Sequence, residues 1–564
     1  MKMVRLALLP CSLALLLACA GVGAQQGDPA DGSVPAGSVA YVSIDVNHIQ
    51  QFWDQVKNTA AVKALTPPAK PGSRPNSGFA QMLGMFNQAF QGRVAIAFSD
   101  DPPTPKQPPA MVAVFPARSR EDAAALLRVV EMGLKQENAQ VTPREYHGAT
   151  ITALSGGKLK DARVCYALLS DRLLLGTDEG WLEKAIDTTA GGFPALAAAP
   201  EFEAVRARLA AMGPAAGWYW VDTQRLNGMM MTQIEAAVQN PPESGPAAKM
   251  PPIPKFDFRV LRSMMTAYKS SGGRLVLSPQ GITVDGISLV NAENEFGRKI
   301  LAQTGARPRS AELTSANALL YLSYTNVPFA IEMVRTILGA LEGDAQKMLG
   351  GLGQSIQMMT GLDPEADLLR HIGGEWALVL NDVPTGPASF PLMLYVQTTN
   401  RAGLGKSLQR LRASLAEGMQ LKFEEKNIPQ GRIYSALPGK SPVPVTPGWT
   451  FAGDFLVVGA MASTLKSPLF LAAGGQNSLA AAPAYRQALD GGERVLAVAF
   501  VNLSKLAPLA GQIHSRRPQK PGAAGPDPRR VQAALTALRS FSMVSTLQPD
   551  ALAYRVNLSL DLAE

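Results

Sequence analysis

Cysteine is scarce in this chain of 564 residues, with three in all. Cys11 and Cys19 lie in an N-terminal apolar segment, so Cys165 is the one cysteine expected in the folded body. A single thiol cannot form an internal disulfide, which excludes the disulfide-stapled scaffolds of many exported proteins. Residues 163–169 read as a strand, where Cys165 is interpreted as a small buried side chain. Since no convincing activating cation or histidine is found close in sequence, a reactive thiol is not predicted.

Histidine is almost as rare, and the usual catalytic motifs are missing. The four histidines are His48, His147, His371 and His514, and no two are spaced as a zinc-binding pair. Neither an HExxH helix motif nor a GxSxG nucleophile elbow occurs, which argues against zinc peptidases and typical α/β-hydrolases. No metal and no cofactor is therefore predicted. A triad assembled in space from distant residues stays open, which keeps a hydrolase as one alternative.

Long apolar runs are also missing, since none reaches the roughly 20 residues that a membrane-spanning helix needs. The N-terminal apolar run covers residues 6–18, follows Lys2 and Arg5, and is followed by small residues at 22–24. This order is typical of a secretory signal peptide, predicted over residues 1–24.

Cys19 leaves the mode of export open. It follows Leu16-Leu17-Ala18 and resembles the lipid-carrying cysteine of a bacterial lipobox. The predicted location is therefore extracytoplasmic: a soluble periplasmic or secreted product, or alternatively a protein anchored by lipid to the outer membrane.

A strong excess of one charge sign is absent too. The chain has 53 Lys and Arg against 45 Asp and Glu, a formal net charge of +8. Spread over this length, such an excess is not the signature of a nucleic-acid-binding protein. Hydrophobic residues make up 46% and charged residues 17%, a composition typical of a folded globular chain and too apolar for disorder.

What the sequence does contain is one long pattern written twice. Tyr41 in "AYVSI" matches Tyr321 in "LYLSY" at an offset of 280, and "SDRLLLG" at 170–176 matches "GDFLVVG" at 453–459 at an offset of 283. The same order of segments holds along the whole length. We therefore expect a mobile N-terminus over residues 25–32, a first repeat over 33–302, a linker over 303–312 and a second repeat over 313–564.

Each repeat alternates strand-like runs with helix-like stripes. An apolar stripe of helical spacing follows the first strand, and each repeat is expected to close with a long Pro-rich loop, a helix and a hairpin. The hairpins are predicted over residues 274–290 and 543–560, and the helices before them over 256–268 and 530–539. Helices after hairpin-rich segments favour an α+β fold, with a mostly antiparallel sheet in each repeat.

Four stretches resemble a known family. They are "VPAGSVAYVSID" at 34–45, "YHGATI" at 146–151, "YALLSDRLLLGTDEGWLEKAID" at 166–187 and "TGLDPEADLLRHIGGEWAL" at 360–378. Together they resemble a family of bacterial exported proteins known only as a domain of unknown function. These motifs mark turns and helix ends rather than chemistry. The resemblance therefore implies an extracytoplasmic protein and assigns no activity, cofactor or site residue.

One stretch imitates a nucleotide-binding loop. Residues 403–407, "GLGKS", stand between a strand-like run and a helix-like run expected from Leu404. The first glycine of a phosphate-binding loop would fall on Asn400, which compromises the tight turn that presents N–H groups to phosphate. Nucleotide binding is therefore not predicted. Residues 363–374 imitate a calcium loop in the same way, and are interpreted as a helix start with Asp363 as N-cap and Pro364 at N1.

Two further features bear on a binding role. Methionine runs at 229–231 and 358–359 suit adaptable apolar surfaces, although core packing is the simpler interpretation. A Pro- and Gly-rich loop near the C-terminus carries five cations with little opposing charge, which suits contact with an acidic polymer or membrane surface. These five residues are Arg516, Arg517, Lys520, Arg529 and Arg530.

The sequence thus predicts an exported bacterial envelope protein without catalytic residues, most simply a binding or scaffolding protein for an unidentified envelope component. A carrier of a lipid-like ligand, with residues 229–231 near its mouth, is the first alternative, and a hydrolase is the second.

Overall fold

A computed structural model describes most of the chain after its N-terminal segment. It describes residues 30–59, 85, 88–101, 109–159, 163–239, 257–340, 351, 354–355, 357–382, 390–437, 446–506 and 536–561. The chain divides into two compact units. The first unit comprises residues 1–233, 268–291 and 562–564, and the second comprises residues 234–267 and 292–561. No helix in the described part of the chain is long and apolar enough to cross a membrane.

The first unit contains an antiparallel sheet of ten strands, in the order β4-β5-β6-β7-β3-β2-β1-β8-β9-β10. The strands are β1 (Ser38–Asp45), β2 (Arg93–Ser99), β3 (Met111–Pro116), β4 (Ala139–Tyr146), β5 (Ala149–Gly156), β6 (Val164–Leu168), β7 (Arg172–Gly176), β8 (Gly217–Val221), β9 (Tyr268–Ser278) and β10 (Gly281–Val290). Its longer helices are α2 (Val46–Val56), α5 (Arg120–Gln136), α6 (Glu179–Thr189) and α7 (Pro200–Ala211); α8 (Thr223–Gln239) passes residue 233, where the first unit's segment ends.

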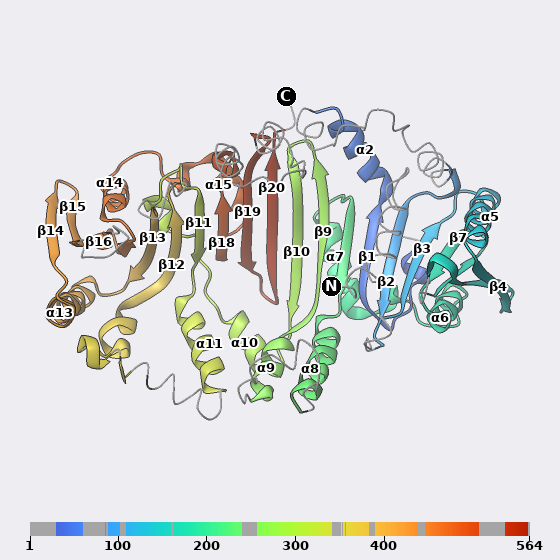
Figure 1. The fold of residues 1–564 in the computed structure, drawn as a ribbon, viewed down its shortest axis with the longest axis horizontal. Helices are drawn as coiled ribbons and strands as arrows, with labels where there is room; N and C mark the ends of the chain where they lie inside the picture. Colours follow the sequence, from blue (N-terminus) through green and yellow to red (C-terminus); the bar gives the residue numbers. More distant parts are fainter. Residues whose placement is uncertain are drawn as a thin grey trace, which may run out of the picture. The chain divides into compact units, whose positions relative to one another are not determined.

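The second unit repeats this strand order as β14-β15-β16-β17-β13-β12-β11-β18-β19-β20, again antiparallel throughout (Figure 1). The strands are β11 (Leu320–Tyr324), β12 (Ile372–Leu380), β13 (Leu392–Thr398), β14 (Phe423–Ile428), β15 (Gly431–Ala436), β16 (Gly448–Ala452), β17 (Phe455–Gly459), β18 (Val495–Val501), β19 (Leu538–Leu547) and β20 (Ala551–Leu560). The helices are α9 (Phe258–Met265), α10 (Glu295–Leu301), α11 (Val327–Gly339), α13 (Arg401–Met419), α14 (Lys466–Ala472) and α15 (Pro483–Ala488).

Short helical turns complete both units. In the first they are η1 (Asp31–Ser33), η2 (Gly157–Leu159) and η3 (Leu196–Ala198). In the second they are η5 (Ser310–Leu313), η6 (Pro364–Leu368, a π-helical turn), η7 (Leu369–His371), η8 (Ala462–Leu465), η9 (Leu479–Ala481) and η10 (Leu503–Leu506).

Burial in the second unit alternates along the central strands, as period-2 side-chain geometry requires. On one face Tyr321, Val379 and Tyr395 are fully buried in a core cluster, together with residues of η5, η8, α14, η9 and α15. The Tyr321 ring meets the Tyr485 ring edge-on at 5.6 Å between centroids. We call this covered face the inner face of the sheet, and the opposite face the outer face. In the first unit a second cluster, including Ile96, Ala113 and Leu126 of α5, covers part of the outer face.

The predicted α+β class with a mostly antiparallel sheet is confirmed. Each unit also contains the expected hairpin, β9–β10 and β19–β20, although both hairpins begin five or six residues earlier than predicted. The helix predicted over 256–268 is the shorter α9. Of the helix predicted over 530–539, residues 530–535 lie outside the described residues. Leu538 begins β19, because main-chain pairing with β20 extends the strand to this residue.

The predicted domain boundaries and the tandem repeat stay predictions. The predicted signal peptide lies outside the described residues. Of the segment 25–32, residues 30–32 are described, and Asp31 is buried and accepts a hydrogen bond from the Tyr41 hydroxyl.

Candidate functional site

Residues 403–407, which resemble a nucleotide-binding loop in sequence, lie inside helix α13. Asn400 is the N-cap, and its side-chain oxygen accepts a hydrogen bond from the Gly403 N–H at 2.9 Å. The Leu404 N–H donates to the Asn400 carbonyl at 3.0 Å, as in any first helical turn. These N–H groups are used within the helix, so they do not form a phosphate cradle. The helix begins three residues before the predicted Leu404, because the Asn400 cap compensates for two helix-weakening glycines.

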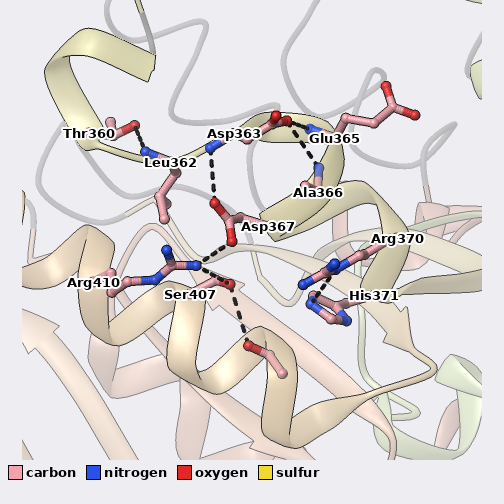
Figure 2. A network of polar contacts seen from close by, with 11 residues as sticks. Thr360, Leu362, Asp363, Glu365, Ala366, Asp367, Arg370, His371, Ser407 and Arg410 are labelled. Carbon is pink, nitrogen blue, oxygen red and sulfur yellow. Dashed lines mark hydrogen bonds and ion pairs between the residues drawn. The ribbon is translucent and has the colours of Figure 1, made fainter.

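A polar network precedes α13 in the chain and contacts it in space (Figure 2). Asp363 caps η6 by accepting hydrogen bonds from the N–H groups of Glu365 at 2.8 Å and Ala366 at 3.0 Å, as its N-cap interpretation requires. The Asp367 carboxylate accepts the Asp363 N–H at 3.0 Å and pairs with Arg410 of α13. These two contacts, the backbone one foremost, hold the pKa of Asp367 below its usual value. The network fastens η6 to α13.

The same network contains the serine, histidine and carboxylate that a hydrolase would need, but not in relay order. His371 and Ser407 are 6% and 2% exposed, respectively. The His371 Nε2 accepts a hydrogen bond from Arg370 Nε at 3.2 Å, while the Ser407 hydroxyl donates to the Gly403 carbonyl at 3.4 Å. The Asp367 carboxylate pairs with Arg410 rather than with the imidazole (Figure 2). The serine and the histidine of this network are thus hydrogen-bonded to other groups and not to each other.

His147 forms a second histidine–carboxylate contact, in the first unit. Its Nδ1 lies 3.1 Å from the Asp187 carboxylate of α6, and the Tyr146 hydroxyl donates to the same carboxylate at 2.9 Å. That hydrogen bond is the main cause of a raised pKa of Tyr146. The His147 side chain is 70% exposed, and its ring stacks on Tyr146 at 4.3 Å. The cluster clamps the β4–β5 turn onto α6.

The remaining candidate side chains are placed as follows. Cys165 is buried, and burial raises the pKa of its thiol to about 12, which agrees with the interpretation of an inert core residue. In α8, Met231 is buried and Met230 is exposed, and neither lines any of the cavities described below. Met358 and Met359 are both exposed. The candidate lipidation site Cys19 and the five cations Arg516, Arg517, Lys520, Arg529 and Arg530 lie outside the described residues.

A groove that sequence reasoning missed lies between the start of α13 and strands β14–β16. Its larger part has a volume of about 810 Å³, and its lining includes Arg401, Arg432, Tyr434 and Phe451. A narrow extension of about 50 Å³ continues between α13 and β16, past Arg412 and Trp449, and shares Tyr434 and Phe451 with the larger part. We call the two parts together the α13 groove. A neighbouring cavity of about 440 Å³ lies at Gln430 and Phe470.

Aromatic rings form the floor of the α13 groove. Tyr434 and Trp449 stack with centroids 5.4 Å apart and an interplanar angle of 17°. Arg401 lies 5.1 Å over the Phe451 ring, and Arg412 lies 5.5 Å over the Tyr434 ring. The floor follows from strand geometry: Trp449 and Phe451 are two residues apart on β16, and Tyr434 pairs directly with Trp449. That alternation was visible in "GWTFA" and could have indicated the site.

The charge of the groove is positive. Two of its arginines share the Glu425 carboxylate, which lies 3.0 Å from Arg432 and 3.8 Å from Arg412. Interaction with Tyr434, and next the charge of Glu425, raises the pKa of Arg432. Three guanidinium groups thus surround the aromatic floor against one carboxylate, an arrangement that suits a ligand with a negative group and a flat or apolar part. Within the described residues, no cluster of histidine, cysteine and carboxylate side chains could hold a metal ion.

Comparison with known proteins gives a family and no function. A family model described as "Protein of unknown function (DUF3352)" matches residues 88–435. No curated protein matches the sequence. Among solved structures, crystal form III of TP0453 is 11% identical, with a TM-score of 0.26, over 50% of this chain and 90% of that one. Crystal form IV of TP0453 is also 11% identical, with a TM-score of 0.26, over 47% and 81%. A similarity of this size carries no argument about function.

Proposed function

We propose that this chain, which belongs to the DUF3352 family of proteins of unknown function, is an exported, non-catalytic binding protein of the bacterial cell envelope. It recognises an acidic ligand in the α13 groove. The observation that carries this proposal is the excess of three arginines over one glutamate around a floor of stacked aromatic rings.

Export is supported by the N-terminal sequence. Lys2 and Arg5, the apolar residues 6–18 and the small residues 22–24 follow the order of a secretory signal. Both products remain part of the proposal: a soluble protein that diffuses freely after signal cleavage, or a protein held at a membrane by a lipid on Cys19.

The absence of catalysis is supported by the hydrogen bonds of the network in Figure 2. His371 accepts from Arg370 and Ser407 donates to a backbone carbonyl, so neither is poised for proton transfer to a substrate. Both side chains are almost completely buried, which also denies a substrate access.

We also infer that the two units arose by duplication. Their sheets share one strand order, and equivalent main-chain hydrogen bonds recur: Arg118 N–H to Ala89 O at 2.8 Å in the first unit and Thr399 N–H to His371 O at 2.9 Å in the second. The N-caps Ser119 of α5 and Asn400 of α13 both accept from the N–H three residues on.

The test uses 1-naphthyl phosphate, a fluorescent probe with one anionic group and one flat apolar ring. We expect saturable binding that weakens as salt is added, because charge pairs at a groove are screened. The variant Arg401→Gln, Arg412→Gln, Arg432→Gln should bind at least about tenfold more weakly, since each charge-assisted hydrogen bond is worth about 1.5–3 kcal/mol. Arg118→Gln, Arg120→Gln, Arg128→Gln in the first unit is the charge-matched control.

Equal binding by the two triple variants would contradict a site in the α13 groove. Equal binding of uncharged 1-naphthol and the phosphate by the parent protein would contradict recognition of an acid.

A further inference from the structure

The outer face of the second unit's sheet is apolar in rows that run across its strands. Residues paired directly across neighbouring strands lie on one face. The middle row crosses eight strands, and all its residues are apolar: Trp449, Val458, Leu394, Leu378, Leu322, Ala499, Met543 and Val556. We call the outer face of strands β16, β17, β13, β12, β11, β18, β19 and β20 the outer strip.

The two neighbouring rows have the same character. One contains Phe451, Leu456, Val396, Trp376, Tyr324, Ala497, Ser545 and Tyr554, and the other contains Leu392, Leu380, Leu320, Val501, Phe541 and Leu558. Of the 22 residues in the three rows, Ser545 alone is neither aliphatic nor aromatic. An antiparallel sheet with one face in water normally alternates apolar with polar residues, and this one does not.

The outer strip is exposed to solvent at three residues of its middle row, on either side of its centre. Val458 is 39% exposed, Leu394 37% and Met543 44%, while Leu378, Leu322 and Ala499 between them are half-buried. A contiguous apolar surface of this kind marks a binding surface in a folded protein, because leaving it in water costs about 25 cal/mol for each Å².

The chemistry of the outer strip identifies its occupant. Protein interfaces are only about 56–65% apolar. In the three rows the side chains that carry a hydrogen-bonding group are the two tryptophans, two tyrosines and one serine, and the middle row has only the Trp449 N–H. A surface this uniform matches hydrocarbon. At the β16 end, Trp449 and Phe451 belong both to the rows and to the α13 groove, so the apolar strip begins where the arginines lie. Apolar strip and cationic groove are one continuous surface.

We propose that the second unit binds an anionic amphiphile, with its acidic head group at Arg401, Arg412 and Arg432 and its acyl chain along the middle row of the outer strip. This proposal rests on the proposed function, because it uses the α13 groove for the head group. It also defines the ligand class, an acidic lipid or fatty-acid-like molecule.

The dimensions agree. From Trp449 to Leu322 the middle row crosses four gaps between strands, about 19 Å at the usual spacing of about 4.8 Å. One acyl chain of a bilayer leaflet spans about 15 Å, half of the hydrocarbon core. A single chain extending from the groove therefore reaches the half-buried centre of the outer strip without leaving it.

The first experiment needs only the parent protein. Alkyl phosphates from butyl to dodecyl, below their critical micelle concentrations, compete with 1-naphthyl phosphate for the α13 groove. Each added methylene should strengthen competition roughly fourfold, which is the transfer free energy of one buried CH₂ expressed as a binding ratio. If naphthyl phosphate binds but the affinity of alkyl phosphates is independent of chain length, the amphiphile inference is wrong and the proposed function stands. If no phosphate binds, the proposed function itself fails.

The second experiment places the chain on the outer strip. Leu394→Ser, Val458→Thr should bind dodecyl phosphate at least tenfold more weakly and leave naphthyl phosphate binding unchanged. Val129→Thr, Met132→Ser alters two exposed apolar residues of α5 and should change neither. Circular dichroism confirms that each variant is folded. An equal loss of dodecyl phosphate binding in both variants would overturn the inference, because the effect would be non-specific. A concentration-dependent dimer of the parent protein that only Leu394→Ser, Val458→Thr abolishes would also overturn it, because the occupant of the outer strip would then be a second copy of the chain.

Discussion

The two units carry the same sheet and treat its outer face differently. In the first unit Ala113 of β3 is 0% exposed and pairs with Ile96, which is 9% exposed. In the second unit the matching residue Leu394 of β13 is 37% exposed and pairs with the half-buried Leu378. The larger apolar side chain thus lies where solvent reaches it. A shared strand order therefore does not decide whether a face becomes core or surface.

The covering residues explain the difference. By their hydrogen bonds and N-caps, Ala89 and Leu126 of the first unit correspond to His371 and Ser407 of the second. Leu126 packs into the apolar cluster over the outer face, whereas Ser407 forms hydrogen bonds with the Gly403 carbonyl and Arg410 of its own helix. A buried polar group needs partners of its own and contributes little to an apolar cover. The polar network of Figure 2 thus stands where the first unit has a hydrophobic cap.

The largest expected effect contrasts matched residues of the two outer faces. Phe115 of β3 is 1% exposed and corresponds to the half-buried Val396 of β13. Phe115→Ala should cost about 3–5 kcal/mol because it opens a cavity in a closed cluster. Val396→Ala should cost about 1 kcal/mol, since the side chain is already partly hydrated. Native-state hydrogen exchange of β3 and β13 reports each unit separately. Equal costs would mean that the second outer face is as well covered as the first.

Much of this frame was predictable from sequence, because it rests on local rules. The alternating strands, the closing hairpins and the Asp363 cap follow from period-2 burial, turn residues and capping preferences. The α13 groove and the outer strip were not predicted. Both depend on which strands lie side by side, and the sequence of one strand does not determine which strands pair with it.

The register of one hairpin shows where sequence matching fails. The offset of 283 that aligns residues 170–176 with 453–459 also aligns Gly148 with Gly431. The strand pairings shift this match by one residue, because the first turn consists of His147-Gly148 and the second of Pro429-Gln430. His147 and Gly148 both have positive φ, at 46° and 79°, which proline cannot adopt. The second turn therefore takes another form, and its glycine opens strand β15.

A smaller effect concerns pH. Glu375 of β12 is buried, and its carboxylate accepts the N–H groups of Arg309 at 2.8 Å and Ser310 at 2.9 Å. Burial raises the pKa of Glu375 above its usual 4.5. A raised acid pKa means that the folded state holds the proton more tightly than the unfolded state, so stability falls as pH rises from 4.5 through the folded-state pKa.

The first unit has Arg93 at the matching position and should lack this dependence. Glu375→Gln should remove the fall from the second unit while keeping an acceptor for one N–H group. The measurement is hydrogen exchange of β12 between pH 4.5 and 7 in parent and variant. Identical slopes for the two proteins would show that Glu375 is not the titrating group. Asp367, whose pKa is lowered chiefly by the Asp363 N–H, acts in the opposite direction, and its contribution is lost only as pH falls through 3.8 and below.

The smallest expected effect concerns residues 403–407, which resemble a nucleotide-binding loop. Lys406 lies exposed in the second turn of α13, and the capping residues align it with Ala125 of α5, which occupies the same helical position without a charge. Lys406→Ala should therefore change the free energy of unfolding by less than about 0.5 kcal/mol, as surface substitutions away from caps and cores usually do. A phosphate-binding lysine would behave otherwise, because its removal would abolish ATP binding. Equilibrium dialysis with ATP compares the two proteins: no saturable binding by either is the expected result, and binding by the parent that the variant lacks would restore the nucleotide interpretation of residues 403–407.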